Sequence, residues 1–341
     1  MTKGERAPDK TPRQRLSFLS LVSLFPCSPV SLLSLPPLPL SPILVSGLIN
    51  IETTVRVDGF PIPYFPVHYP FFGVRSSVSG VGFNVSKALT TLGNEVRFLS
   101  LIGTDASGTL VRGELAQIGV DDRYVLPQVA ETAQSAILYD ETGRRQINVD
   151  LKDIQETAYP EARFEQAAAD CELAVLCNIN FSRPLLALAR RRGMTIASDV
   201  HTIADLDDPY NSDFMRAADI LFMSNEALPV SPQEWAAAVQ ARYGNQIVVI
   251  GLGAQGALLA VKGEPPLHVP AAVTRPVVNT IGAGDALFSS FLHEFRKSRN
   301  PYIAIRKSMV FASFKVGESG AAAGFLNETE LDIWTQRTRT P

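Results

Sequence analysis

Cysteine, histidine and tryptophan are scarce in this 341-residue chain, so the side chains that disulfide-rich proteins and zinc proteins need are few. Cys27, Cys171 and Cys177 are too few for a disulfide framework, which favours a reducing compartment. The four histidines show no metal-ligand spacing, so we expect no zinc site. A net charge of −3 and a pI near 5.9 provide no basic surface, so no nucleic-acid partner is expected.

Long apolar runs are also scarce. Basic residues within 3–15 precede an apolar run at 16–25, as in a secretory signal. Prolines from Pro26 onward limit any helix there to about ten residues, too short to cross a bilayer. No small-x-small cleavage site follows. We therefore expect residues 1–41 to be a disordered or targeting extension of a cytoplasmic protein that has no membrane partner, and import into an organelle stays open.

The remaining chain has the composition of a globular protein, with 46% hydrophobic and 19% charged residues. Apolar strand patterns occur at 43–46, 96–102, 123–126, 173–177, 195–198, 220–223 and 246–250. Helical patterns separate most of them. This alternation predicts an α/β fold with a mostly parallel central sheet and helices on both faces. We expect one domain over residues 42–325, followed by a C-terminal tail at 326–341.

Two stretches interrupt this α/β alternation and indicate a small β lid. Residues 54–78 alternate, turn at Asp58-Gly59 and continue rich in aromatic residues and proline, and 131–150 contains a clear hairpin pattern. We expect the two to pair and to close over a substrate. The aromatic residues at the lid fit lid packing or a homodimer contact better than stacking on a nucleobase: Tyr64, Phe65, Tyr69, Phe71 and Phe72.

The run Asn-Thr-Ile-Gly-Ala-Gly-Asp-Ala at 279–286 is the strongest candidate for an active site. It follows a strand-like stretch at 276–278 and precedes apolar residues at helical spacing. Glycines before a helix let unpaired backbone N–H groups surround a phosphate. Asp285 at such an anion site would accept a proton from an attacking hydroxyl, whereas the alternative is an ordinary helix N-cap.

A second glycine motif, Gly80-Val81-Gly82-Phe83-Asn84, also leads into a helical pattern, which Gly93 ends. Farther upstream, Asn50 and Glu52 follow the first strand and would share one side of an extended chain.

The run 251–256 matches the GxGxxG of dinucleotide-binding proteins and follows a strand. That match makes an NAD(P)-dependent oxidoreductase an alternative function. However, residues 257–261 read as another strand, and no acidic residue lies about twenty positions farther on to hold a ribose. We therefore interpret the run as a glycine turn between two strands, whose backbone can approach a nucleotide phosphate.

Together these motifs resemble those of the ribokinase-like, PfkB-type sugar and nucleoside kinases, over residues 42–320. The resemblance implies a three-layer sandwich with a small β lid. It implies that the amides of Gly282, Ala283 and Gly284 form an anion hole and that Asp285 is the catalytic base. It also implies that the sugar or nucleoside substrate contacts the polar and glycine positions Asn50, Glu52, Gly80, Gly82 and Asn84.

The resemblance further implies that ATP and Mg²⁺ are used. The nucleotide would lie along the glycine turn at Gly251, Gly253 and Gly256, near Gly284 and near Asn225, which resembles the Asn of an NxxE element. Leu228 stands where that element has its Glu, so the metal ligands are unknown, with Glu226 as one candidate.

Three other positions depart from the family pattern. Ser79 replaces a glycine, and Glu52 replaces the commoner Asp and reaches about one methylene farther, which bears on the substrate. Asn279 replaces an Asp that helps to bind a monovalent cation. It can ligate through its carbonyl oxygen but carries no charge, so dependence on that cation is uncertain.

Two alternatives remain beside an active kinase: a kinase-like binding protein without turnover, and the oxidoreductase. The identity of the sugar or nucleoside does not follow from the sequence. Arg144 and Arg145 at the hairpin turn fit exposed surface positions, and His201 after a strand fits a structural role.

Overall fold

The computed structural model describes residues 40–338, and residues 1–39 of the extension expected at 1–41 lie outside this range. The main sheet is nine-stranded, in the order β13-β12-β11-β10-β9-β8-β1-β4-β5. The strands from β11 to β5 in this order pair parallel, whereas β12 pairs antiparallel with both β11 and β13. The predicted mostly parallel sheet is confirmed.

The central strands are apolar and buried on both faces, as strands in a parallel sheet must be. The main-sheet strands are β1 (Ile43–Ser46), β4 (Val96–Ile102), β5 (Val125–Pro127), β8 (Leu173–Leu176), β9 (Thr195–Thr202), β10 (Ile220–Ser224), β11 (Ile247–Gly251), β12 (Ala257–Val261) and β13 (Leu267–Val269). Because β1 lies between β4 and β8, the polar residues that follow β1 emerge from an inner strand of the sheet rather than from its edge.

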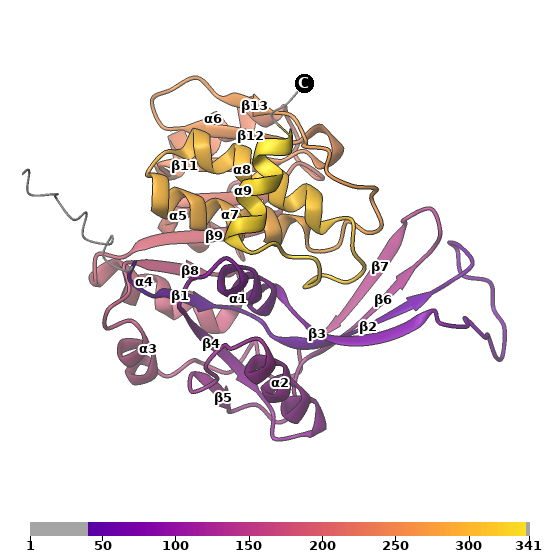
Figure 1. Cartoon of the computed structure of the whole chain (residues 1–341). Helices are drawn as coiled ribbons and strands as arrows, with labels where there is room; N and C mark the ends of the chain where they lie inside the picture. Colours follow the sequence, from indigo (N-terminus) through magenta and orange to yellow (C-terminus); the bar gives the residue numbers. More distant parts are fainter. Residues whose placement is uncertain (1–39, 339–341) are drawn as a thin grey trace, which may run out of the picture. The chain divides into compact units, whose positions relative to one another are not determined.

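Helices cover both faces of the sheet (Figure 1). The buried side chains form two separate hydrophobic clusters. The first face packs against α1 (Val81–Thr91), α2 (Ala106–Gln117), α7 (Ala283–Ser298), α8 (Pro301–Lys315) and α9 (Glu328–Thr338). The second packs against α3 (Glu161–Ala167), the short helix η1 (Asn180–Ser182), α4 (Arg183–Arg191), α5 (Ser212–Ala217) and α6 (Pro232–Tyr243). These are the three layers that the resemblance implied.

Local sequence sets several helix ends. Helix α6 begins with a capping box between Ser231 and Glu234 and ends at Gly244 in the left-handed region. Helix α8 begins where the Asn300 side chain accepts hydrogen bonds from two backbone N–H groups. Helix α7 differs, because its N-cap is Gly282 and no side chain caps it. No side-chain cap therefore competes with a ligand for the N–H groups at this end.

The two lid segments form a separate four-stranded sheet in the order β3-β2-β6-β7 (Figure 1). Its strands are β2 (Asn50–Arg56), β3 (Val74–Ser79), β6 (Gln134–Tyr139) and β7 (Arg145–Asp150). Strand β2 pairs antiparallel with β3 and parallel with β6, so the two excursions join as expected. The closing motion of this lid stays a prediction.

The C-terminal part of the chain differs from expectation in two places. The strand-like stretch 276–278 forms no strand, and Val277 and Val278 are exposed. The expected tail contains α9, which packs against α8 through Trp334 on Phe314 and through buried Leu331. The boundaries of the predicted domains otherwise stay predictions. Within residues 40–338, no helix is both long and apolar enough to cross a membrane.

Candidate active site

The predicted anion hole lies at the uncapped start of α7. Gly282 has φ +76°, and a Cβ built there would lie 3.0 Å from Ala321 Cα, so only glycine fits this turn. A Cβ built on Gly284 would meet nothing within 4 Å. The amide of Ala283 donates to the Thr280 carbonyl at 3.2 Å, so this one of the three amides expected in the anion hole is engaged within the turn. The open space at Gly284 and the uncapped helix end can accommodate a phosphate.

Asp285 lies inside the first turn of α7, so it is not the N-cap. Its side chain is buried, and Asn84 Nδ2 from α1 donates to its Oδ2 at 2.7 Å. Burial raises the pKa of the Asp285 carboxyl above its usual value, while the Asn84 hydrogen bond and the nearby His201 and Lys315 act in the opposite direction. A raised carboxyl pKa suits a group that accepts a proton near neutral pH.

Asn50 and Glu52 lie on one face of β2 and are buried. Asn50 Nδ2 donates to Ser135 Oγ at 3.0 Å, and Ser79 Oγ donates to Glu52 Oε2 at 3.1 Å. Burial raises the pKa of Glu52, and the Ser79 hydrogen bond opposes that shift. Ser79, a departure from the family pattern, thus orients Glu52.

Three buried oxygens near this face have no hydrogen-bond partner among residues 40–338: Asn50 Oδ1, Glu52 Oε1 and Asn84 Oδ1. Buried polar atoms without hydrogen-bond partners are uncommon, because each one reduces the stability of the fold. All three are acceptors, and a sugar supplies hydroxyl donors. The sequence-predicted residues therefore come together as a set of acceptors that a polyol would complete.

The glycines of the second motif serve the packing between strand and helix. Gly80 has φ +102°, and a Cβ built on Gly82 would lie 2.5 Å from the backbone of Gly47. The start of α1 therefore lies directly against the end of β1. This contact places Asn84 where it reaches Asp285.

The run 251–256 is a turn between antiparallel strands, as interpreted. After the single-turn helix η2 (Gly253–Gln255), Gly256 leads into β12, so the motif opens no long helix of the kind that dinucleotide-binding proteins require. Gly256 has φ +100°, and a Cβ there would lie 2.6 Å from the amide of Ala271. Asn225 N donates to the Gly251 carbonyl at 3.0 Å, so this predicted nucleotide residue lies beside the turn.

No group of three or more acidic, histidine or cysteine side chains in the described part of the chain is placed to hold a metal ion. Mg²⁺ in phosphoryl-transfer sites is bound by substrate phosphates with one or two carboxylates, so such a cluster is not required. Glu226 is exposed after β10, and its carboxylate forms no ion pair within residues 40–338. It fits a role as an outer ligand for a nucleotide-bound Mg²⁺.

The lid reaches the anion-hole segment through Arg145, whose guanidinium donates to Thr280 Oγ1 at 3.4 Å. Arg145 is exposed, as expected, and this contact was not predicted. The aromatic residues between β2 and β3 are largely exposed, so packing within the lid does not explain them: Tyr64, Phe65, Tyr69, Phe71 and Phe72. A homodimer contact there stays a prediction.

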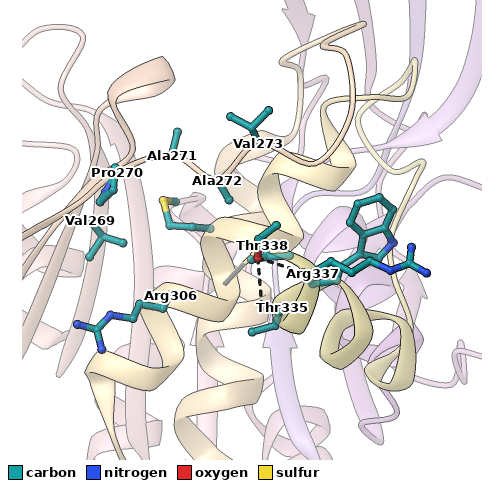
Figure 2. A pocket seen from close by; sticks show the side chains of 12 residues that line it. Val269, Pro270, Ala271, Ala272, Val273, Arg306, Thr335, Arg337 and Thr338 are labelled. Atoms are coloured by element: carbon teal, nitrogen blue, oxygen red, sulfur yellow. Dashed lines mark hydrogen bonds between the residues drawn. The ribbon is translucent and has the colours of Figure 1, made fainter. Parts of the chain in front are cut away.

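Two site features were not predicted. Lys315, at the end of α8, is fully buried, and its Nζ donates to the carbonyl oxygen of Ile281. The other is a pocket of about 570 Å³ between the segment after β13, α8 and α9 (Figure 2). It is lined by Val269, Pro270, Ala271, Ala272, Val273, Arg306, Met309, Val310, Trp334, Thr335, Arg337 and Thr338. The pocket adjoins the glycine turn, because Gly256 packs against Ala271.

Comparisons with known proteins agree with this geometry. The model of the pfkB family of carbohydrate kinases matches residues 41–329. The chain is 29% identical over 255 residues to the acarbose 7(IV)-phosphotransferase of Actinoplanes sp., which covers 73% of this chain and 83% of that one. It is 30% identical over 312 residues to the 1-phosphofructokinase of Haloferax volcanii, covering 85% of this chain and 97% of that one.

Solved structures show the same fold. A microbiome-derived acarbose kinase superposes with a TM-score of 0.80 at 25% identity, over 87% of this chain and all of that one. A ribokinase of Thermotoga maritima, 21% identical, superposes with a TM-score of 0.71 over 87% of this chain and 99% of that one. The three-layer fold with its small β lid and the family match over most of the chain give one conclusion: the chain belongs to the pfkB family of carbohydrate kinases.

Proposed function

We propose that this protein transfers the terminal phosphoryl group of ATP to a hydroxyl of a sugar or nucleoside, with Asp285 as the general base. The observation that carries the proposal is the 2.7 Å hydrogen bond between Asn84 and Asp285. It joins the acceptor-binding motif to the anion-binding motif, which lie 201 residues apart in the chain. The hydroxyl that attacks would therefore be held beside the group that takes its proton.

In this mechanism the unpartnered oxygens of Asn50, Glu52 and Asn84 accept hydrogen bonds from substrate hydroxyls. Asp285 takes the proton of one hydroxyl as that oxygen attacks the terminal phosphorus of ATP, and the bond from this phosphorus to the bridging oxygen breaks, so that ADP leaves. The uncapped N–H groups at the start of α7, with the positive end of its dipole, stabilise charge on the phosphoryl oxygens. Mg²⁺ bound to the ATP phosphates supplies further charge neutralisation. Positioning and preorganised electrostatics account for such catalysis.

The pocket between α8 and α9 is the proposed site of the adenine ring. Along α8, Met309 in the pocket lies six residues before Lys315 below the anion hole, a separation of about 9 Å. The glycine turn adjoins the pocket, so the phosphates can run along it from the base to α7. Trp334, which packs on Phe314, gives the pocket an aromatic wall.

Replacing Trp334 with alanine should raise KM for ATP about tenfold and leave kcat within a factor of about three, because the loss of one aromatic contact weakens base binding alone. Trp334→Phe keeps an aromatic face and should retain most of the affinity. Steady-state kinetics with each substrate varied in turn checks this. An unchanged KM for ATP, or an equal rise in KM for the sugar, would contradict adenine binding here.

A sugar that already carries an anionic group is a second candidate acceptor, supported by three arginines on the lid. Thr54 and Arg56 lie on the same face of β2 as Glu52, because side chains alternate along a strand. Arg75 pairs with Thr54 across the sheet, and Arg145 pairs with Tyr139, which in turn pairs with Arg56. The three arginines therefore share the face of Glu52. Arg56 and Arg75 are both exposed on the lid. A ribose-1-phosphate kinase of Halopiger xanaduensis, 25% identical over 300 residues, is named for such a substrate.

A phosphotransfer assay with ATP over neutral sugars, oligosaccharides, sugar phosphates and nucleosides tests the proposal and separates the two acceptor classes. Arg75→Ala should raise KM for a phosphorylated sugar about tenfold and leave a neutral sugar unaffected, because a charge-assisted hydrogen bond is lost. Arg191→Ala on α4, away from the lid, is the control. No transfer to any acceptor, combined with tight binding of one of them, would instead support a kinase-like binding protein.

A further inference from the structure

Lys315 is fully enclosed beneath the anion-hole segment, where lysines are seldom found without a partner. Its Nζ donates to the carbonyl oxygen of Ile281, the residue before Gly282. The charged groups that face it are Asp285 from α7, Glu52 from β2, and Arg275 and Glu318 from the flanking loops. Burial lowers the pKa of Lys315 to about 8, and the two site carboxylates act to raise it, so it is mainly protonated at neutral pH.

The segment that carries the Ile281 carbonyl is docked on the end of α8. The amides of Val278 and Asn279 donate to the Val316 carbonyl at 2.8 and 3.0 Å. Arg275 Nε donates to the Phe314 carbonyl at 2.7 Å. The Lys315 ammonium is therefore held in fixed register with the peptide that leads into the anion hole.

The residues at this place do not fit the monovalent cation that the family resemblance implied. The oxygen expected to ligate it, Asn279 Oδ1, accepts a hydrogen bond from the Ile281 amide at 2.7 Å. The neighbouring carbonyl oxygen of Ile281 accepts from Lys315. A free cation would compete with these donors for both oxygens and would be repelled by the ammonium. Compared with the family pattern, Asn279 in place of Asp removes one negative charge from this place, and Lys315 supplies one positive charge to it.

We propose that the Lys315 ammonium is a tethered replacement for the monovalent cation, which orients the peptide before Gly282 and offsets negative charge beside Asp285. Lys315 is thus a positioning residue, and the enzyme needs no added K⁺. The kinetic consequences of this inference rest on the proposed phosphotransferase function. Its prediction about ion binding is independent of that function.

The first test uses the unaltered protein with KCl, NaCl or tetramethylammonium chloride at constant ionic strength. We expect kcat to vary by less than about twofold, because the tethered ammonium leaves no role for a free cation. A cation site coupled to the reaction would have a larger effect, since coupled effector sites typically change a binding constant by about 5- to 150-fold. A rise of more than about fivefold with K⁺ alone would overturn the proposal.

Two substitutions test the charge itself. Lys315→Met keeps most of the volume and should lower kcat by about a hundredfold, with the KM of the sugar within about threefold, because preorganisation of the anion hole is lost. Lys315→Ala leaves space for an ion, and K⁺ or NH₄⁺ should restore part of its kcat. Lys262→Ala, at an exposed lysine, is the control. Normal kcat in Lys315→Met, or a Lys315→Ala variant indifferent to both ions, would overturn the proposal.

Thermal unfolding in the same salts gives a readout that needs no turnover. The Tm of the unaltered protein should not differ between K⁺ and tetramethylammonium, whereas the Tm of Lys315→Ala should rise selectively with K⁺ or NH₄⁺ as the ion binds the folded state. A selective rise in the unaltered protein would overturn the proposal. If no acceptor is phosphorylated, the proposed function fails, and the thermal data still decide the role of Lys315.

Discussion

Asp285→Asn should lower kcat by about 10²- to 10⁴-fold while ATP binds nearly as tightly as before, because the variant keeps the shape of the site but loses its proton acceptor. Asn84 can still donate to the side-chain oxygen of the new residue, as it does to Asp285 at 2.7 Å. Steady-state kinetics and nucleotide titration measure the two effects separately. A variant that retains more than about a tenth of the original kcat would contradict the assignment of Asp285 as base.

The same substitution should leave Tm unchanged or raise it. Burial raises the pKa of Asp285 in the folded state, so the ionised carboxylate destabilises the fold at neutral pH relative to a neutral side chain. Asparagine removes that cost. Asp213→Asn is the control, because Asp213 is exposed and pairs with Arg183 and Arg216 at the surface. The kcat of this variant should not change. A large loss of stability in Asp285→Asn would indicate a structural carboxylate instead.

Gly284→Ala should lower kcat by about a hundredfold without weakening the fold, since the new methyl group would occupy the space proposed for the transferred phosphoryl group. The Cβ built at this position meets nothing within 4 Å, and the backbone there is already helical. Alanine favours the helix more than glycine does, so Tm should hold or rise. Kinetics with thermal unfolding checks the combination of lost turnover and kept stability.

Gly113→Ala is a matched control for Gly284→Ala. Gly113 lies in α2, and its Cβ would also meet nothing within 4 Å. We expect the same small gain in stability with no change in kcat, because Gly113 is exposed to solvent on α2 and its new methyl group would touch no site residue. Normal turnover in Gly284→Ala would show that the phosphoryl group does not approach the start of α7.

The sequence alone was sufficient to predict the elements that burial and turn residues specify locally. Strands β1, β4 and β12 match the ranges expected at 43–46, 96–102 and 257–261, because burial on a sheet face specifies each one. The turn at 251–256 could also be predicted locally, because the apolar runs on both sides of the glycine motif indicated two strands rather than a strand and a helix.

The unpredicted features all depend on distant contacts. Val277 and Val278 read as part of a strand, but the Val278 amide finds its acceptor on Val316, at the end of α8. Lys315 resembles any surface lysine until α7 and α8 pack and enclose it. The segment at 328–338 has few apolar residues, and only its contact with α8 makes it a wall of the pocket. The same holds for Arg145, which the lid brings to Thr280.

The lid and the Asn84–Asp285 pair also bear on how this protein folds. Asn50 meets Ser135 across 85 residues of chain, and Asn84 meets Asp285 across 201. Contacts of such high sequence separation form slowly, because the closure of long loops costs entropy before the contact repays it. Helices and neighbouring strands therefore assemble ahead of the site. During refolding, circular dichroism should recover before kinase activity, so activity reports the completed topology rather than the mere presence of secondary structure.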